Sequence, residues 1–395
     1  MDSNKPLQPP SPPSAGEEGK MKPEMIGGNN CSTHTYYVRS CKRKRLTDIE
    51  SLPDEVLFEV LLRLEAQDIY DSARLVCRKL YHMIHTHTFI YAHLQRSTYG
   101  LLFQSTFGDS FFMSVGESGR VEISKNRYNF RYHSPTSCNG LLLGFEGGIY
   151  VSNPTTRQMF ALPQFVGYSN YIIHYCYFGI AYAAASMQYK AVIIAQAEGG
   201  KRACCILTIG VDNSWRTVGT ECESLQNRVR LSTPLITEGF VHWYGRDTNE
   251  VWTMNVETEI ITKTSSPIPR VVYGNRQNIF LSTGIYLSLL RPCGEYCWEV
   301  WEMKPKIDYR WRKVCDISLE AHKCTTFQRF GFNEYNYLIP VGWLKYLEVL
   351  VFRTRDQILV FNLVTQEFVT VELLAPQIYC KTVVHKNSLV WLGGC

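Results

Sequence analysis

The sequence predicts an α+β protein of more than one domain, in which a small all-α segment precedes a mainly antiparallel all-β domain. Apolar residues recur with a helical period within residues 51–94. From about Tyr99 onward, short runs rich in Val, Ile, Tyr, Phe and Trp alternate with Gly, Asn, Asp and Pro, which is typical of strands and turns. The chain has 395 residues, of which 45% are hydrophobic and 19% are charged, enough for one large domain and a small one.

Residues 1–47 are predicted to form a disordered basic tail, because they offer too little apolar surface to offset the entropy of ordering. This tail contains 8 Lys/Arg and 4 Asp/Glu, or +4, which leaves +1 of the net +5 for the rest of the chain. The larger part therefore shows no basic footprint for nucleic acid. The cluster Lys42, Arg43, Lys44 and Arg45 is either a nuclear import signal or a solvated run of charge.

Residues 48–96 are predicted to form short helices. Val56, Leu57, Val60, Leu61 and Leu64 fall on one side of a helix whose first turn contains Pro53, Asp54 and Glu55. A second helix follows from Asp68, with apolar residues on one side: Ile69, Ala73, Val76, Cys77 and Leu80. About 40 residues rarely form a stable core alone, so this surface needs a partner, either another protein or the C-terminal domain of the same chain.

Residues 97–395 are predicted to form a propeller-like domain. Three segments align, beginning at Ile149, Val251 and Ile358, and each has a strand, an Asn-x-x-Thr turn and a second strand. The turns begin at Asn153, Asn255 and Asn362. Two more hairpins begin at Cys204 and Cys297, which gives five at a spacing of roughly 45–60 residues, the spacing of propeller blades.

The helical segment resembles an F-box, the motif by which substrate receptors bind the Skp-type adaptor of a Skp–cullin–F-box ubiquitin ligase. The matching residues are Leu52-Pro53-Asp54-Glu55, Arg63-Leu64, Asp68-Ile69 and Val76-Cys77-Arg78-Lys79. Glu65 and Leu80 depart from the motif, which has Pro and Trp at these places. The resemblance implies an adaptor-binding surface drawn from these residues: Leu52, Pro53, Val56, Leu57, Val60, Leu61, Leu64, Ile69, Val76 and Cys77. Leu52, Pro53, Val56, Leu57 and Leu61 are expected to be exposed until the adaptor covers them.

The following region resembles the F-box-associated domain of many plant proteins. The most specific blocks are Ser137-Cys138-Asn139-Gly140-Leu141-Leu142 and Asn153-Pro154-Thr155-Thr156-Arg157-Gln158. Further matches are Leu162-Pro163, Phe178-Gly179 and Gly239-Phe240-Val241-His242-Trp243.

No catalytic motif is found in the sequence: it has no phosphate-binding loop, no Gly-x-Ser-x-Gly and no His-Glu-x-x-His. Cys293 and Cys297, with His322 and Cys324 downstream, are better explained by a hairpin turn than by a zinc site. No cofactor and no metal are expected. With no secretory signal and no membrane-spanning stretch, the 14 cysteines are interpreted as reduced thiols of an intracellular protein, in the nucleus, the cytoplasm or both.

The sequence thus predicts a non-catalytic ligase subunit that binds a Skp-type adaptor and, through it, a cullin, while the propeller-like domain binds an unknown target protein. Neither nucleic acid nor a membrane is expected as a partner. Candidate target-binding residues lie in loops rich in Tyr, Arg and Asn: Tyr168, Tyr171, Arg246, Arg270 and Tyr273. Two alternatives remain: an F-box scaffold without a degraded target, and a propeller that binds a glycan or another small ligand.

Overall fold

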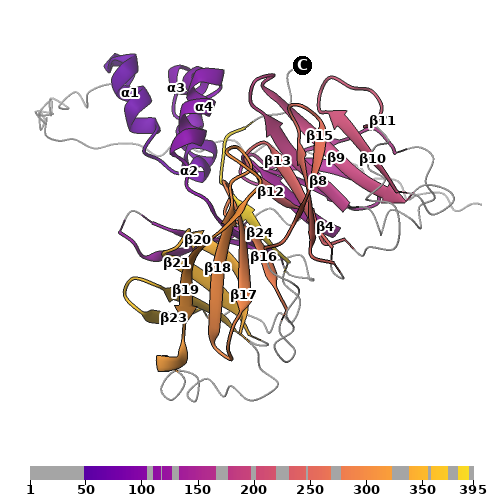
Figure 1. Cartoon of the computed structure of the whole chain (residues 1–395). Coiled ribbons are helices and arrows are strands. Elements are labelled where there is room, and N and C mark those ends of the chain that lie inside the picture. Colours follow the sequence, from indigo (N-terminus) through magenta and orange to yellow (C-terminus); the bar gives the residue numbers. More distant parts are fainter. Residues whose placement is uncertain are drawn as a thin grey trace, which may run out of the picture. The chain divides into compact units, whose positions relative to one another are not determined.

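The computed structural model describes residues 49–104, 110–116, 118–126, 133–165, 177–196, 202–218, 231–245, 248–267, 277–322, 338–354, 357–371 and 381–390. Residues 49–395 form one compact unit, in which helices precede a ring of antiparallel sheets (Figure 1). The predicted α+β division is therefore confirmed. The tail with its basic cluster Lys42–Arg45 lies outside the described residues.

The helical part contains four α-helices and two short 3-10 helices within residues 49–96. In chain order these are η1 (Ile49–Ser51), α1 (Asp54–Leu61), α2 (Ala66–Asp71), η2 (Ala73–Leu75), α3 (Arg78–Ile84) and α4 (His87–Arg96). Pro53 lies at the N-cap of α1, and Asp54 and Glu55 occupy its first turn, where carboxylates complement the helix dipole. Thr86 caps α4, because its hydroxyl accepts a hydrogen bond from the Phe89 amide at 3.2 Å.

The described strands form six four-stranded antiparallel sheets, which are the six blades of a propeller. Four blades follow the chain order. Their strands are β4 (His133–Cys138), β5 (Leu141–Phe145), β6 (Ile149–Asn153) and β7 (Gln158–Ala161); β8 (Tyr177–Ala183), β9 (Gln188–Gln196), β10 (Arg202–Thr208) and β11 (Arg216–Thr217); β12 (Leu235–Thr237), β13 (Phe240–Tyr244), β14 (Glu250–Asn255) and β15 (Ile260–Ser265); and β16 (Ile279–Ser282), β17 (Leu287–Pro292), β18 (Cys297–Met303) and β19 (Trp311–Ser318).

The other two blades complete the ring. One contains β20 (Ile339–Lys345), β21 (Val349–Arg353), β22 (Ile358–Asn362) and β23 (Glu367–Val371), after a 3-10 turn η6 (Glu320–His322). The last combines β24 (Lys381–His385) from the C-terminal end of the chain with β1 (Gly100–Gln104), β2 (Ser110–Val115) and β3 (Val121–Asn126). Strands β24 and β1 pair in register, with Leu102 opposite Val383, so the two ends of the domain close the ring together.

The five hairpins found in the sequence are the outer two strands of five blades: β6–β7, β10–β11, β14–β15, β18–β19 and β22–β23. The sixth outer hairpin, β2–β3, turns at Gly116 and Gly119 and has no Asn-x-x-Thr signal. In the three repeats, the predicted Asn turn is confirmed. Each Asn side chain accepts hydrogen bonds from the amides two and three residues later, as Asn255 does from Glu257 at 2.9 Å and Thr258 at 3.3 Å.

The inner strands β24, β4, β8, β12, β16 and β20 follow one another around the axis of the ring. After β24 the chain runs to Leu389, which packs in the core of the helices, so the inner strands end on the side of the helices. We call this side the helix-side rim and the opposite side the far rim. The Asn-x-x-Thr turns belong to the helix-side rim, because turns alternate between rims along each blade.

Candidate functional site

The helices pack around a small apolar core of their own. Leu57 and Leu61 of α1, Ile69 of α2 and Phe89 of α4 are all buried there, together with Leu80 and Ile84 of α3. Leu80, which replaces the Trp of the motif, is thus a core residue of this structure. Because α1 has apolar side chains on more than one side, filling this core leaves a second apolar face uncovered.

This second face consists of exposed aliphatic side chains, and we call it the outer face: Val56, Val60, Leu64, Leu75 and Val76. Val56 and Val60 lie one helical turn apart on α1 and are 46% and 53% exposed. Lys79 of α3 contacts the start of α1, through the Leu52 carbonyl at 2.7 Å and the Asp54 carboxylate at 2.7 Å. Lys79 therefore ties the beginning of α3 to the beginning of α1. Large aliphatic side chains left in water are typical of a binding surface.

The structure divides the adaptor-binding residues predicted from the sequence into two groups. Pro53, Val56, Val60, Leu64 and Val76 are exposed, while Leu52 and Cys77 are half-buried. The expectation that Leu57 and Leu61 are exposed is wrong, and Ile69 is buried as well, because these side chains fill the core of the helices. Leu75, which the sequence analysis did not select, is 68% exposed. Adaptor binding by the exposed group stays a prediction.

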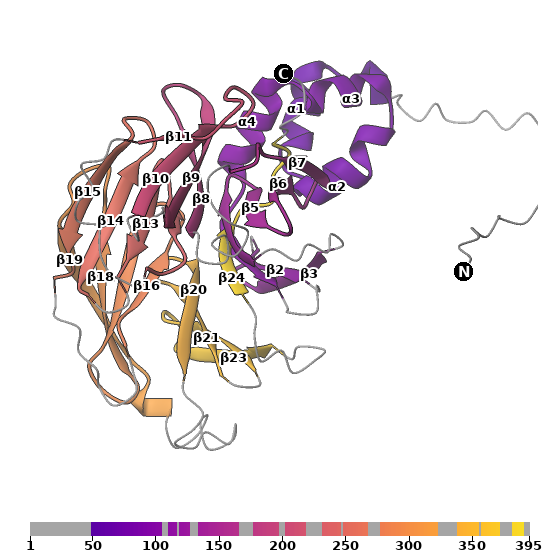
Figure 2. The ribbon, with the colours of Figure 1, turned by 90° about the vertical axis from the view of Figure 1, so that its right-hand side faces the viewer.

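The helices also pack against the propeller, at the end of the β4–β7 blade (Figure 2). Leu94 of α4 is buried in the main propeller core, and Leu389, from beyond β24, is buried in the core of the helices. The Arg157 guanidinium, in the turn between β6 and β7, lies 2.7 Å from the Asp71 carboxylate at the end of α2. Packing of the helical segment on the C-terminal domain, one of the two partners that the sequence left open, is thus observed.

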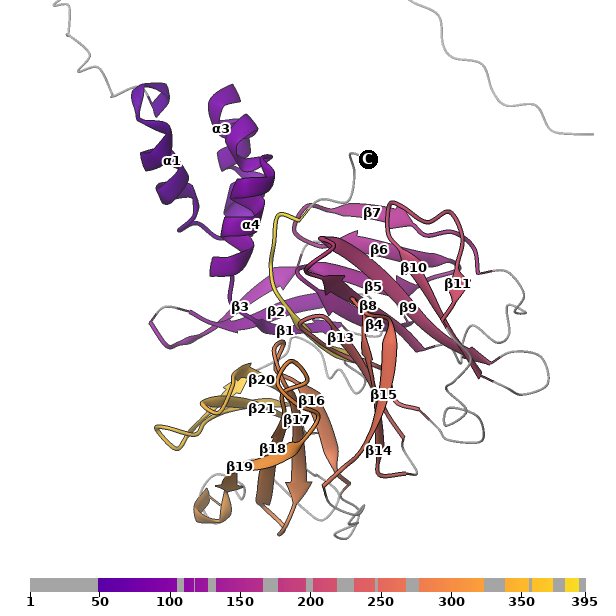
Figure 3. The same cartoon turned by 45° about the horizontal axis from the view of Figure 1, so that its top comes forward.

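The segment after β24 is held by Asn153, the first residue of an Asn-x-x-Thr turn. Its side-chain amide donates hydrogen bonds to the carbonyls of Ser388 at 3.0 Å and Val390 at 2.8 Å. Its carboxamide oxygen accepts from Thr155 at 2.9 Å. In Figure 3 the C-terminal segment runs from β24 past α4. One buried Asn therefore fixes the turn and the segment that carries Leu389 into the helices.

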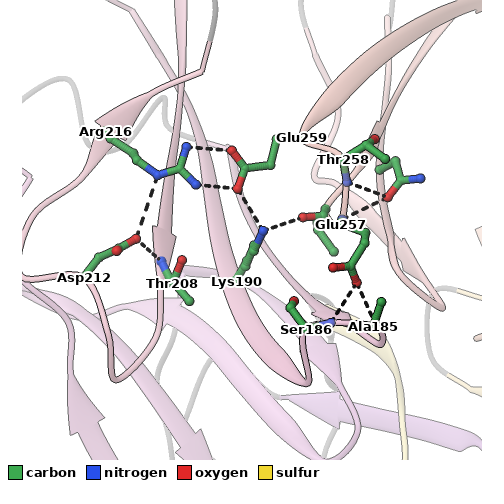
Figure 4. A network of polar contacts seen from close by, with 11 residues as sticks. Ala185, Ser186, Lys190, Thr208, Asp212, Arg216, Glu257, Thr258 and Glu259 are labelled. Atoms are coloured by element: carbon green, nitrogen blue, oxygen red, sulfur yellow. Dashed lines mark hydrogen bonds and ion pairs between the residues drawn. The ribbon is translucent and has the colours of Figure 1, made fainter.

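A second polar network ties two neighbouring blades together on the helix-side rim (Figure 4). Arg216 of β11 forms a bidentate ion pair with Glu259. Glu259 is the last residue of the turn that begins at Asn255. The buried Lys190 of β9 donates to Glu259 at 2.8 Å and to the Val256 carbonyl at 2.9 Å. Glu257 accepts a hydrogen bond from the Ala185 amide at 2.9 Å. The network thus locks the turn after β8 against the turn after β14.

The network makes stability depend on pH. Hydrogen bonds from Arg216, with help from Lys190, lower the pKa of Glu259 from its ordinary value of 4.5 to about 2, against the opposing effect of partial burial. A carboxyl whose pKa is lower in the folded state stabilises the fold fully above pH 4.5, and this contribution is lost as the pH falls toward 2.

We therefore expect Glu259→Gln to lower the free energy of unfolding at pH 7 by about 1–2 kcal/mol, because it removes charge-assisted hydrogen bonds from a partly buried site. Denaturant unfolding between pH 7 and pH 3 measures this. The loss should shrink below pH 4.5. The control is Glu348→Gln, at an exposed ion pair with Lys345, which should change little. An equal loss for both variants at every pH would contradict the role given to Glu259.

Two polar side chains that are buried in the propeller, those of Cys138 and His242, have shifted pKa values. Burial raises the pKa of the Cys138 thiol to about 12, and a protonated thiol is a poor nucleophile. Burial lowers the pKa of His242 to about 3, and its two ring nitrogens lie 2.8 Å from the Thr237 hydroxyl and 2.9 Å from that of Thr253. The ring of His242 in β13 thus links β12 to β14.

The predicted hairpin at Cys293 is present: the Cys293 amide donates to the Cys297 carbonyl at 3.0 Å. The ring of His322 packs against Phe361 and Phe368, and Cys324 lies outside the described residues. Within the described ranges, no group of three His, Cys, Asp or Glu side chains is placed to hold a metal ion. No described helix is long and apolar enough to cross a bilayer.

The candidate target-binding residues lie outside the described residues: Tyr168, Tyr171, Arg246, Arg270 and Tyr273. The described strands next to these segments lie with the adjoining ends on the far rim: β7 and β15 end there, and β8 and β16 begin there.

Comparison with known proteins assigns both parts. Residues 49–97 match the model of the F-box-like family, and residues 90–262 match that of the F-box associated beta propeller domain. The chain carries an F-box followed by an F-box-associated β-propeller. The helical core and the outer face are therefore features of the F-box, and the far rim belongs to the F-box-associated domain.

The chain is also similar to F-box protein At1g20360 of Arabidopsis thaliana, with 25% identity over 241 residues, which cover 53% of this chain and 74% of that one. Among solved structures, a chain of the nidogen/laminin complex is 9% identical, with a TM-score of 0.42, and covers 73% of this chain and 99% of its own. The Dos1 propeller is 9% identical, with a TM-score of 0.35, and covers 70% of this chain and 67% of its own.

Proposed function

We propose that this chain is the substrate-recognition subunit of a Skp–cullin–F-box ubiquitin ligase. The outer face of the F-box binds the Skp-type adaptor, which connects the chain to a cullin, and the far rim of the propeller binds a target protein. The observation that carries the proposal is the outer face: aliphatic side chains stand uncovered on α1 and beside α3 although the helices already have a filled core.

The packing between the two domains supports this division of labour. Leu94 and Leu389 each lie in the core of the other domain, so the F-box is held on the propeller by apolar packing as well as by the Arg157–Asp71 ion pair. A ligase subunit of this kind needs no catalytic group, because it accelerates ubiquitin transfer by holding the target near enzymes supplied by other subunits.

We expect Val60→Lys to weaken adaptor binding by about 30-fold or more, equivalent to about 2 kcal/mol, because it places a charge in the centre of an apolar interface. Lysine suits this position, since a cation near the C-terminal end of α1 is compatible with the helix dipole. The matched control is Val364→Lys, which changes a 71% exposed valine in the turn between β22 and β23. If the two variants bind the adaptor with equal affinity, the outer face is not the adaptor-binding surface.

The function itself is tested by affinity purification from cells, with and without a proteasome inhibitor, followed by mass spectrometry. Wild-type chain should recover the adaptor, a cullin and a target that accumulates under inhibition. Val60→Lys should recover the target without the adaptor and the cullin. A bound protein that neither acquires ubiquitin nor accumulates under inhibition would instead favour a scaffold role.

A further inference from the structure

The axis of the propeller contains a cavity of about 180 Å³ between the inner strands. Its walls come from β4, β12, β16, β20 and β24, and from Thr233 and Pro234, which precede β12 and so lie toward the far rim. A volume of this size holds about a dozen water molecules, or a compound with about as many non-hydrogen atoms. The cavity is far from the outer face of the F-box and is not used in the proposed ligase function.

Tyr99 lies on the helix side of the ring, near its axis. It precedes β1, in the blade that contains β24, yet its hydroxyl donates to the Gly284 carbonyl at 3.3 Å, in the turn between β16 and β17. These two blades are not neighbours, because the β20–β23 blade lies between them, so the ring of Tyr99 must pass close to the axis. The ammonium of Lys386 lies 4.2 Å from the centre of this ring. Tyr99 therefore lies across the axis on the helix side, while the lining residues Thr233 and Pro234 place part of the cavity toward the far rim.

The wall of the cavity is rich in hydroxyl groups and free of charge. Hydroxyls are contributed by six lining residues: Thr136, Ser137, Thr233, Tyr244, Ser282 and Thr382. The inner strands contain acidic or basic residues only at their ends, Lys345 in β20 and Lys381 in β24, apart from His133 and His385. His385 lies behind the wall, with Nδ1 2.8 Å from the Ser137 hydroxyl, and it is fully buried and neutral, since burial lowers its pKa to about 3.

One hydroxyl of this wall has no partner among the residues that the structure describes. Thr136 of β4 is 2% exposed, lines the cavity, and its Oγ1 forms no hydrogen bond with any described residue. A buried hydroxyl without a partner costs free energy, so such groups are normally satisfied by water or by a ligand. Thr136 Oγ1 is therefore a hydrogen-bonding group in the wall that no described residue satisfies.

We propose that this axial cavity binds a small uncharged polyhydroxy compound of the size of a six-carbon polyol or monosaccharide. Hydroxyl groups of the ligand would pair with Thr136 and the other hydroxyls of the wall, and its carbon skeleton would contact the aliphatic side chains Ile236, Leu281 and Val341. Charged compounds are disfavoured, because no opposite charge on the described wall offsets the loss of their hydration.

The test uses the full-length chain and saturation-transfer NMR with four probes: myo-inositol and D-glucose, which are neutral, and D-gluconate and D-glucosamine, which are charged. A neutral probe should bind saturably, and the charged probes should bind at least tenfold more weakly. Thr136→Val keeps the shape of the side chain but removes its hydroxyl, and should weaken the neutral probe by about tenfold, the contribution of one hydrogen bond.

The matched control is Thr370→Val in the outermost strand β23, which should bind the neutral probe like the wild type. Circular dichroism of both variants checks that each is folded. Absence of saturable binding of both neutral probes would show that the cavity holds water only and would overturn the proposal. Equal binding of neutral and charged probes, or unchanged affinity in Thr136→Val, would overturn it as well.

Discussion

Replacing Leu389 with Ala is expected to destabilise the F-box and to reduce adaptor binding, although the residue lies almost 300 positions after the F-box in the sequence. Leu389 is 7% exposed and packs among the F-box residues Ile69, Ile84 and Phe89. Removing a buried leucine side chain costs about 2–5 kcal/mol, through lost apolar contact and the cavity that remains. Thermal unfolding and adaptor affinity, measured on the full chain, report the two effects.

The control for Leu389 is Val364→Ala on the helix-side rim, which should stay within about 0.5 kcal/mol of wild type because its side chain is exposed. Asn153→Ala should partly reproduce the effect of Leu389→Ala, since it releases the carbonyls of Ser388 and Val390. If Leu389→Ala unfolds like the wild type and binds the adaptor equally well, the shared core does not exist in solution.

The same packing changes what is expected of the propeller alone. From the sequence, a fragment from about residue 97 is predicted to fold independently. In the structure, such a fragment lacks Leu94, which is buried in the propeller core, and leaves Leu389 without its F-box partners. We therefore propose that the propeller fragment is less stable than the full chain.

Trp252→Ala is expected to unfold the propeller, at a cost of about 3–5 kcal/mol. Trp252 lies in β14, is fully buried in the largest core cluster, and stands opposite Trp243 of β13. Loss of this side chain leaves a large void between two blades. Denaturant unfolding followed by near-ultraviolet circular dichroism measures both the stability and the fixed packing of the aromatic residues.

Ile260→Ala serves as the control for Trp252, because Ile260 belongs to the neighbouring strand β15 of the same blade but is 62% exposed. The free energy of unfolding of the Ile260→Ala variant should remain close to that of the wild type. A Trp252→Ala variant with native stability would mean that the β12–β15 blade is not packed as described.

The local structure was predictable wherever a short-range signal determines it. The helical period of residues 51–94 located the F-box helices, and the Asn side chains of the Asn-x-x-Thr turns located three outer hairpins. What periodicity does not resolve is the direction of neighbouring apolar side chains. Val56 and Leu57 are adjacent and so point about 100° apart on α1, which puts Leu57 in the core and Val56 on the outer face.

The long-range features left no local signal in the sequence. The pairing of β24 with β1 joins residues that are far apart in the sequence, such as Leu102 and Val383, and it completes the sixth blade. The second role of Asn153, holding the segment before Val390, has the same origin, since its side chain bonds to carbonyls 235 and 237 positions away in the sequence. The cavity and the position of Tyr99 near the axis likewise arise only when non-neighbouring blades meet around the axis.

The central claim, that the outer face of the F-box binds a Skp-type adaptor, is tested most directly by titrating the purified full-length chain with purified adaptor in a calorimeter. We expect saturable binding with one adaptor per chain and a negative heat-capacity change, because the interface buries aliphatic side chains such as Val56 and Val60. The Val60→Lys variant should show little or no heat at the same concentrations. Absence of saturable binding by the wild-type chain, or undiminished binding by Val60→Lys, would contradict the account.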